Sequence, residues 1–166
     1  LTAAHQNDAY AQLNLGNCFE YGTGVDKDLQ MAVYWYERAA NQEEPLAQCN
    51  LGCMYLQGTG VAKDTSTAIT FFRKSAKHRE PHGLYMLGRC YLYGEGVEKD
   101  LSQAFTLINQ AAELGDSWAQ FRLALGYEKG IWGKQDLHEA FTLYERAAKA
   151  GHVNSQMQIA RYYLAG

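Results

Sequence analysis

Four cysteines and five histidines are the side chains of this chain best able to bind a metal ion or act as nucleophiles. Cys49 and Cys53 lie four residues apart, so on a helix both thiols face the same side and can form half of a metal site. His78 and His82 have the same spacing, but Pro81 lies between them at a predicted helix junction and breaks the common face. No second Cys or His pair has a spacing that complements Cys49 and Cys53. The sequence therefore predicts no metal site and no cofactor.

Other patterns that could indicate catalysis predict turns instead. The Gly-x-Gly loops at 22–24, 58–60 and 94–96 follow predicted helices rather than strands and lack the Lys-Ser/Thr pair of a P-loop. They recur with a fixed period, as structural turns do. No serine or carboxylate stands in a pattern with a base and an orienting group, as a catalytic site requires. We predict no catalytic residue and no enzyme activity.

The composition is that of an ordinary soluble chain. Of its 166 residues, 47% are hydrophobic and 20% are charged, and the formal net charge is −3. This small acidic excess gives no electrostatic footprint for nucleic acid. No run of about 18 apolar residues occurs, so we expect no membrane insertion. The cysteines are too few and too irregular for a disulfide framework, which favours a reducing compartment without assigning a localisation.

A repeat of 36 residues runs through the chain without a gap. Such a period is typical of repeat architectures, in which each unit buries its apolar face against its neighbours. The pairs that mark it are Leu15-Gly16, Leu51-Gly52, Leu87-Gly88, Leu123-Ala124 and Ile159-Ala160. We expect a single array of about 4.5 repeats, taken from a longer protein. Its predicted parts are the end of a preceding repeat at 1–7, full repeats at 8–43, 44–79, 80–115 and 116–151, and the first helix of a truncated repeat at 152–166.

Each unit is predicted to be a hairpin of two helices. An acidic residue, such as Asp8 in the first repeat, precedes the first helix, and His152 takes that place in the fifth. A Gly-x-Gly turn follows that helix, and an aspartate such as Asp28 then caps the second helix.

The pattern A-Q-x-x-L-G-x-x-[FY]-x-x-G-x-G-V-x-K-D runs nearly complete over 11–28 and closely over 47–64, and Y-W-Y-E-R-A-A follows at 34–40. This unit resembles the Sel-one-like repeat, a relative of the tetratricopeptide repeat. The resemblance implies an all-α, right-handed superhelical solenoid that serves as an adaptor or scaffold for protein complexes. Repeat four departs from the pattern, because Ala124 replaces the glycine and the loop reads Gly-Ile-Trp-Gly. We expect that loop to take another course and to expose or dock Trp132.

In stacks of this kind the first helices line a concave face, and five positions per repeat face that groove. A solvated face would be polar, yet these positions hold aromatic and apolar side chains with isolated arginines, as a peptide-binding groove needs. The predicted partner-binding residues are Tyr10, Asn17, Leu46, Cys49, His82, Tyr85, Arg89, Tyr93, Trp118, Phe121, Met157 and Arg161, with Tyr85, Arg89, Trp118 and Phe121 at the centre.

Other interpretations of these positions stay open. Leu13, Leu56 and Leu92 can simply pack between neighbouring first helices, and flanking repeats or a second copy of the chain can cover part of the face. We predict a scaffold that binds another protein or an extended peptide along the concave face. The alternatives are a structural module for self-association or spacing, as a homo-oligomer, and a hydrolase that uses Cys49, Cys53 or a histidine.

Overall fold

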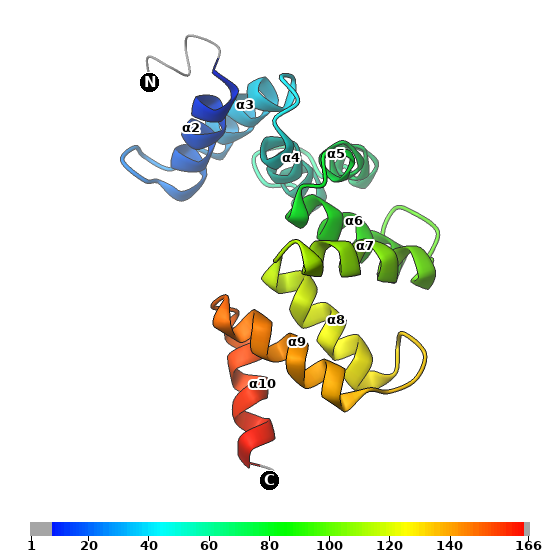
Figure 1. Ribbon diagram of the computed structural model, residues 1–166. Helices are drawn as coiled ribbons and strands as arrows, with labels where there is room; N and C mark the ends of the chain where they lie inside the picture. The colour runs from blue at the N-terminus through cyan, green and yellow to red at the C-terminus, as the bar shows by residue number, and fades with distance from the viewer. Residues whose placement is uncertain (1–7, 165–166) are drawn as a thin grey trace. The chain divides into compact units, whose positions relative to one another are not determined.

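The computed structural model describes residues 8–164, and every regular element in that range is a helix. The helices are α2 (Ala9–Tyr21), α3 (Leu29–Ala40), α4 (Pro45–Gln57), α5 (Thr65–Lys77), α6 (Pro81–Tyr93), α7 (Leu101–Glu113), α8 (Ser117–Lys129), α9 (Leu137–Lys149) and α10 (Val153–Leu164). They follow one another as helix–turn–helix hairpins (Figure 1). The predicted all-α helical repeat is confirmed over this range. The predicted end of a preceding repeat at 1–7 lies outside the described residues. None of the described helices is long and apolar enough to cross a membrane.

An aspartate begins each second helix, as predicted. Asp28, Asp64, Asp100 and Asp136 occupy the N-cap in an extended backbone conformation, and each carboxylate accepts hydrogen bonds from backbone N–H groups of the first turn. Such a cap contributes about 1 kcal/mol of stability. The four hairpins therefore share one local signal that fixes where their second helix starts.

The residues before the first helices cap in more varied ways. Asp8 and Asp116 each accept a hydrogen bond of 2.6 Å from the N–H group three residues further on. Glu80 accepts from the N–H group at the same spacing, whereas the Glu44 side chain caps nothing. His152 uses imidazole Nδ1 for this role, 3.3 Å from the backbone nitrogen three residues on. The histidine at this position therefore replaces the acidic cap.

The chain divides into two compact units, which we call unit 1 (1–83) and unit 2 (84–166), and the division falls within α6. The core of unit 1 surrounds Tyr36, which is fully buried among Leu13, Leu51 and small residues of α3 and α4. The Tyr36 hydroxyl lies 2.6 Å from both Asn17 Oδ1 and Glu20 Oε2. Burial, together with the Glu20 carboxylate, raises the pKa of Tyr36 well above its usual range.

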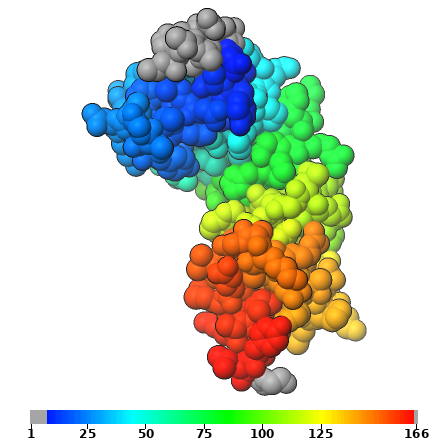
Figure 2. Space-filling view, turned by 60° about the vertical axis from the view of Figure 1, so that its left-hand side comes forward, coloured from blue at the N-terminus to red at the C-terminus, as the bar shows by residue number. Residues whose placement is uncertain are grey.

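The core of unit 2 follows the same plan with different residues. Ile108, Leu143 and Tyr144 are buried, and α9 packs against both α8 and α10. The orange α9 and the red α10 adjoin on the surface in Figure 2. One carboxylate links the three helices, since Glu128 of α8 accepts hydrogen bonds from the hydroxyls of Tyr144 (2.9 Å) and Tyr162 (3.3 Å).

The irregular loop of repeat four docks its tryptophan against the preceding helices. Trp132 Nε1 donates a hydrogen bond of 3.1 Å to the Leu123 carbonyl, and the ring lies 5.6 Å from that of Phe105. Gly126 makes this possible, because a Cβ there would lie 1.7 Å from Trp132 Nε1. Of the two outcomes expected for Trp132, docking is confirmed.

Candidate functional site

The structure separates the predicted partner-binding residues by exposure. Exposed side chains are Tyr10, Leu46, Tyr93, Trp118, Met157 and Arg161; half-buried ones are Asn17, His82, Arg89 and Phe121; buried ones are Cys49 and Tyr85. Leu13, Leu56 and Leu92 are buried, which confirms the packing interpretation for those three. Single exposed apolar residues are ordinary on protein surfaces. An exposed side chain therefore indicates a binding site only where it lies close to polar or charged groups that can also contact a partner.

Two guanidinium groups gather around the buried Tyr85 in unit 2. Burial raises the pKa of Tyr85, and the positive charges of Arg122 and Arg89 act in the opposite direction. Arg89 is 3.6 Å from a Glu95 carboxylate oxygen, and Arg122 lies over the Tyr93 ring, 5.6 Å from its centroid. The Nε atoms of both arginines are buried and have no hydrogen-bond partner among the described residues. Both side chains are half-buried, and a guanidinium group partly shielded from water suits an incoming carboxylate or carbonyl oxygen.

Arg122 was not among the predicted residues, because it lies outside the five groove positions of its repeat. A signal was present, since Arg122 follows Trp118 by four residues and therefore shares its face of α8. The helical spacing alone could have added Arg122 to the predicted set.

Trp118 lies over a buried histidine that also escaped prediction as a contact residue. The His152 ring is 4.6 Å from the Trp118 ring in an edge-on arrangement and 4.6 Å from the Phe121 ring. Its Nδ1 is 3.0 Å from the Ser155 hydroxyl, while its buried Nε2 has no partner among the described residues. Burial lowers the pKa of His152, and the nearby Asp116 carboxylate acts in the opposite direction. The Trp118 and His152 rings border a pocket of about 250 Å³ between the start of α8 and the turn before α10.

A second pocket of about 250 Å³ lies beside Tyr93. Its wall is mainly apolar, and Trp132 closes one side through its docked ring. Arg122 also borders this pocket, so a cationic group and an apolar recess are adjacent. The residues that line this pocket include Leu92, Tyr93, Leu101, Arg122, Ile131 and Trp132.

In unit 1, Tyr10 and Leu46 are exposed. Asn17, predicted to face a partner, is engaged within the fold, because its Oδ1 accepts from Tyr36 and from Asn50 Nδ2 at 3.3 Å. The binding role of all the predicted residues stays a prediction, and the polar and apolar features best suited to it gather in unit 2.

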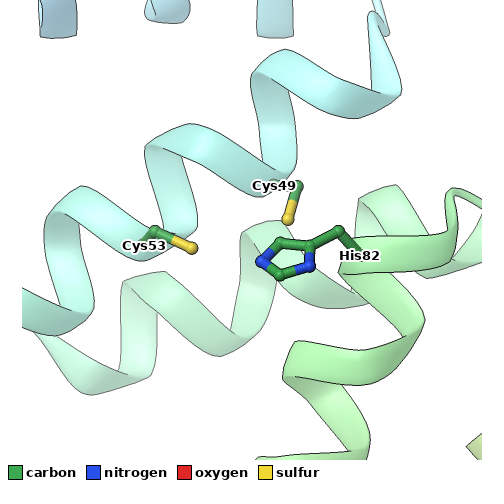
Figure 3. A group of neighbouring side chains, drawn as sticks. All are labelled: Cys49, Cys53 and His82. Carbon is green, nitrogen blue, oxygen red and sulfur yellow. The ribbon is translucent and has the colours of Figure 1, made fainter. Parts of the chain in front are cut away.

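Unit 1 instead brings together two thiols and an imidazole. Cys49 and Cys53 lie on α4, and His82 lies in the first turn of α6, with its ring beside both sulfurs (Figure 3). Their possible ligand atoms all lie within 4.8 Å of one another. Cys49 is buried, whereas Cys53 and His82 are half-buried. Spacing along the chain did not predict that His82 lies beside the two thiols, because they belong to different helices.

All four cysteines are thiols rather than disulfides in the described chain. Cys18 and Cys90 lie on α2 and α6, outside the cluster of Cys49, Cys53 and His82.

Comparison with known proteins gives a consistent result. The Sel1 repeat model matches residues 9–43, 45–79, 81–116 and 119–152. A Sel1 repeat protein from Oxalobacter formigenes is 36% identical over 95% of this chain and 64% of its own length, with a TM-score of 0.85. A protective antigen with an SLR fold from uropathogenic Escherichia coli is 35% identical over 97% of this chain and 34% of its own length, with a TM-score of 0.76.

An immunity protein from Pseudomonas aeruginosa is 25% identical over 93% of this chain and 57% of its own length, with a TM-score of 0.69. The search of curated proteins returned no match. The chain spans about one third to two thirds of the length of these solved relatives. Four matched repeats and two solved relatives above one third identity agree with the helical hairpins, and the chain belongs to the Sel1 repeat family.

Proposed function

We propose that this chain is a non-enzymatic interaction module that binds an extended segment of another protein along the concave face predicted for the first helices. Sel1 repeat proteins are generally protein–protein interaction scaffolds. In this chain the strongest recognition features belong to unit 2. The segment we expect there carries a carboxylate next to an apolar side chain.

The observation that carries this proposal is the pair of half-buried guanidinium groups of Arg89 and Arg122 near the exposed rings of unit 2. A carboxylate can accept hydrogen bonds from a guanidinium in a fixed, planar geometry, which gives both affinity and orientation. Tyr93 and Trp118 are 57% and 50% exposed, so each retains a large apolar surface for a partner to cover. Aromatic and arginine side chains together are typical of the residues that dominate interface energies.

The apolar recess beside Tyr93 supports the second half of the proposal. Its volume of about 250 Å³ suits a single aliphatic or aromatic side chain better than a small-molecule substrate. Because Arg122 borders the same recess, a partner side chain and a partner carboxylate can be bound at neighbouring points of one segment.

A displayed library of random peptides tests this function with the full chain as bait. We expect the enriched sequences to combine an Asp, a Glu or a free C-terminal carboxylate with a neighbouring large apolar residue. For a synthetic peptide of the enriched sequence, Arg122→Glu or Trp118→Ala should weaken binding at least about 30-fold, because each removes a central contact. Circular dichroism should show an unchanged helical content.

Matched controls exist on second helices. Arg73→Glu makes the same charge change on an exposed face of α5, and Tyr34→Ala removes an exposed ring of α3, so both should bind the peptide as wild type does. Equal binding by Arg122→Glu and wild type would contradict the proposal. A concentration-dependent mass in sedimentation that is lost in Trp132→Ala would instead support self-association.

A further inference from the structure

Two sulfurs and one imidazole lie close together in unit 1. The peptide contacts proposed above lie in unit 2 and do not involve them. Cys49 and Cys53 occupy successive turns of the same face of α4. His82 approaches this face from the start of α6, and the three possible ligand atoms lie within 4.8 Å of one another. Two thiolates and an imidazole form one of the ligand sets that proteins use for zinc.

The local structure fixes the position of the His82 backbone beside α4. Ser75 Oγ, near the end of α5, donates a hydrogen bond of 2.7 Å to the Pro45 carbonyl at the start of α4. The Glu80 carboxylate accepts from the Gly83 backbone N–H and thereby caps α6. A Cβ at Gly83 would lie 2.2 Å from Ser75 Oγ, so only glycine allows the first turn of α6 to approach this closely. The hydrogen bonds and the close approach hold the start of α6 beside α4, and His82 with it.

The three side chains of the cluster differ in their exposure to water, and this difference suits the binding of a metal ion. Cys49 is fully buried, while Cys53 and His82 are half-buried. The inner side of the cluster is therefore shielded from water, and the outer side leaves a path by which an ion can enter. Two thiolates neutralise a divalent ion, so the bound group would place no net charge in this partly buried position.

We propose that Cys49, Cys53 and His82 bind one Zn²⁺ ion, with a fourth coordination position open to water or to a ligand from a bound protein. Zinc bonds of about 2.3 Å to sulfur and about 2.0 Å to nitrogen place tetrahedral ligand atoms roughly 3.4–3.8 Å apart. Side-chain rotations that move the ligand atoms by about 1 Å bring the cluster to that spacing. Binding releases the two thiol protons to solvent, and no bond in the chain is oxidised or reduced.

Cobalt provides a spectroscopic test on the full, metal-stripped chain under reducing conditions. We expect one Co²⁺ per chain, with sulfur-to-cobalt charge-transfer absorption and the visible bands of tetrahedral coordination, and stoichiometric displacement by Zn²⁺. Cys53→Ser should remove about half of the charge-transfer intensity. Cys53→Ser and His82→Gln should each weaken Zn²⁺ binding at least about 100-fold, because each removes a direct ligand.

The chain supplies matched controls for each ligand type. Cys18→Ser changes a half-buried thiol of α2, and His78→Gln changes an exposed histidine four residues before His82, so both should bind Zn²⁺ as wild type does. Unchanged affinity in either Cys53→Ser or His82→Gln would overturn the assignment. Cys49 is fully buried, so its replacement tests folding as much as binding.

A measurement without variants tests the same site. Zn²⁺ should slow the alkylation of Cys53 at least about tenfold while leaving that of Cys18 unchanged, as read by mass spectrometry of the digested chain. Equal alkylation rates of Cys53 with and without Zn²⁺ would also overturn the proposal.

Discussion

Two regions of the molecule use the same positions of successive repeats for different chemistry. In unit 1 these positions hold Cys49, Cys53 and His82, and 36 residues later they hold Tyr85, Arg89 and Trp118 in unit 2. The first set brings soft ligand atoms together, whereas the second consists of a buried phenol, the Arg89 guanidinium near it and an exposed indole ring. The repeat thus determines which positions of successive units are equivalent. The residue types at those positions determine what each unit can bind.

The contact between the first and second helix also differs from repeat to repeat. In repeat one the buried Tyr36 hydroxyl engages Asn17 and Glu20, and repeat four has the same kind of link between Tyr144 and Glu128. In repeats two and three the Tyr–Glu pair is replaced by Phe72 with Leu56 and by Ile108 with Leu92. The outer full repeats therefore have a Tyr–Glu hydrogen bond between their two helices, and the inner ones have two buried apolar side chains at the same positions.

The largest effect is expected from copying the thiol–imidazole set to the equivalent positions one repeat earlier. In the Leu13→Cys/Asn17→Cys/Leu46→His variant we expect two Co²⁺ per chain instead of one, because the period places these side chains as it places the native set. Zn²⁺ at about a thousand times its Kd should then raise the free energy of unfolding by about 4 kcal/mol for the added site.

The same variant without Leu46→His is the matched control and should bind a single tight Co²⁺. If the complete graft also binds only one, the equivalence of the two regions is wrong, and the local links around Gly83 decide the geometry instead.

A smaller effect is expected from breaking the polar link of repeat one. Tyr36→Phe should lower the free energy of unfolding by about 2 kcal/mol, because it removes the hydroxyl that donates to the partly buried Glu20 carboxylate. Adding Glu20→Leu reproduces the apolar pair of repeat two and should recover most of that loss. Urea denaturation followed by circular dichroism measures both changes.

Tyr10→Phe removes an exposed hydroxyl and should stay within about 0.5 kcal/mol of wild type. Equal stability of Tyr36→Phe and wild type would show that the Tyr–Glu link contributes nothing that the Phe–Leu packing lacks.

The smallest effect concerns the histidine beneath Trp118 in unit 2. Because burial lowers the pKa of His152 below its ordinary value of 6.5, its contribution to stability is fully present above that pH and is lost as the pH falls through the folded-state pKa. His152→Gln should therefore flatten the decline in unfolding free energy between about pH 7 and about pH 5, by less than about 1.4 kcal/mol per pH unit for a single proton.

His138→Gln changes an exposed histidine of α9 and should leave that decline as in wild type. A His152→Gln profile parallel to wild type would mean that this imidazole titrates alike in the folded and unfolded chain.

Much of the architecture could be predicted because its signals are local. Asp28 and its three equivalents cap helices through neighbouring N–H groups, which residue type and position along the chain are enough to predict. The irregular loop of repeat four was also recognisable from its sequence, although whether Trp132 was exposed or docked was not. That choice depended on the space above Gly126, which only packing reveals.

The sequence by itself determined the helical repeat and the positions that differ from unit to unit, because these depend on residue type and on spacing within one helix. Only the tertiary structure decided that His82 lies beside Cys49 and Cys53 and that Arg122 joins Arg89 around Tyr85. These contacts join side chains from different helices. Their distances depend on how closely successive hairpins pack, which spacing along the chain does not specify.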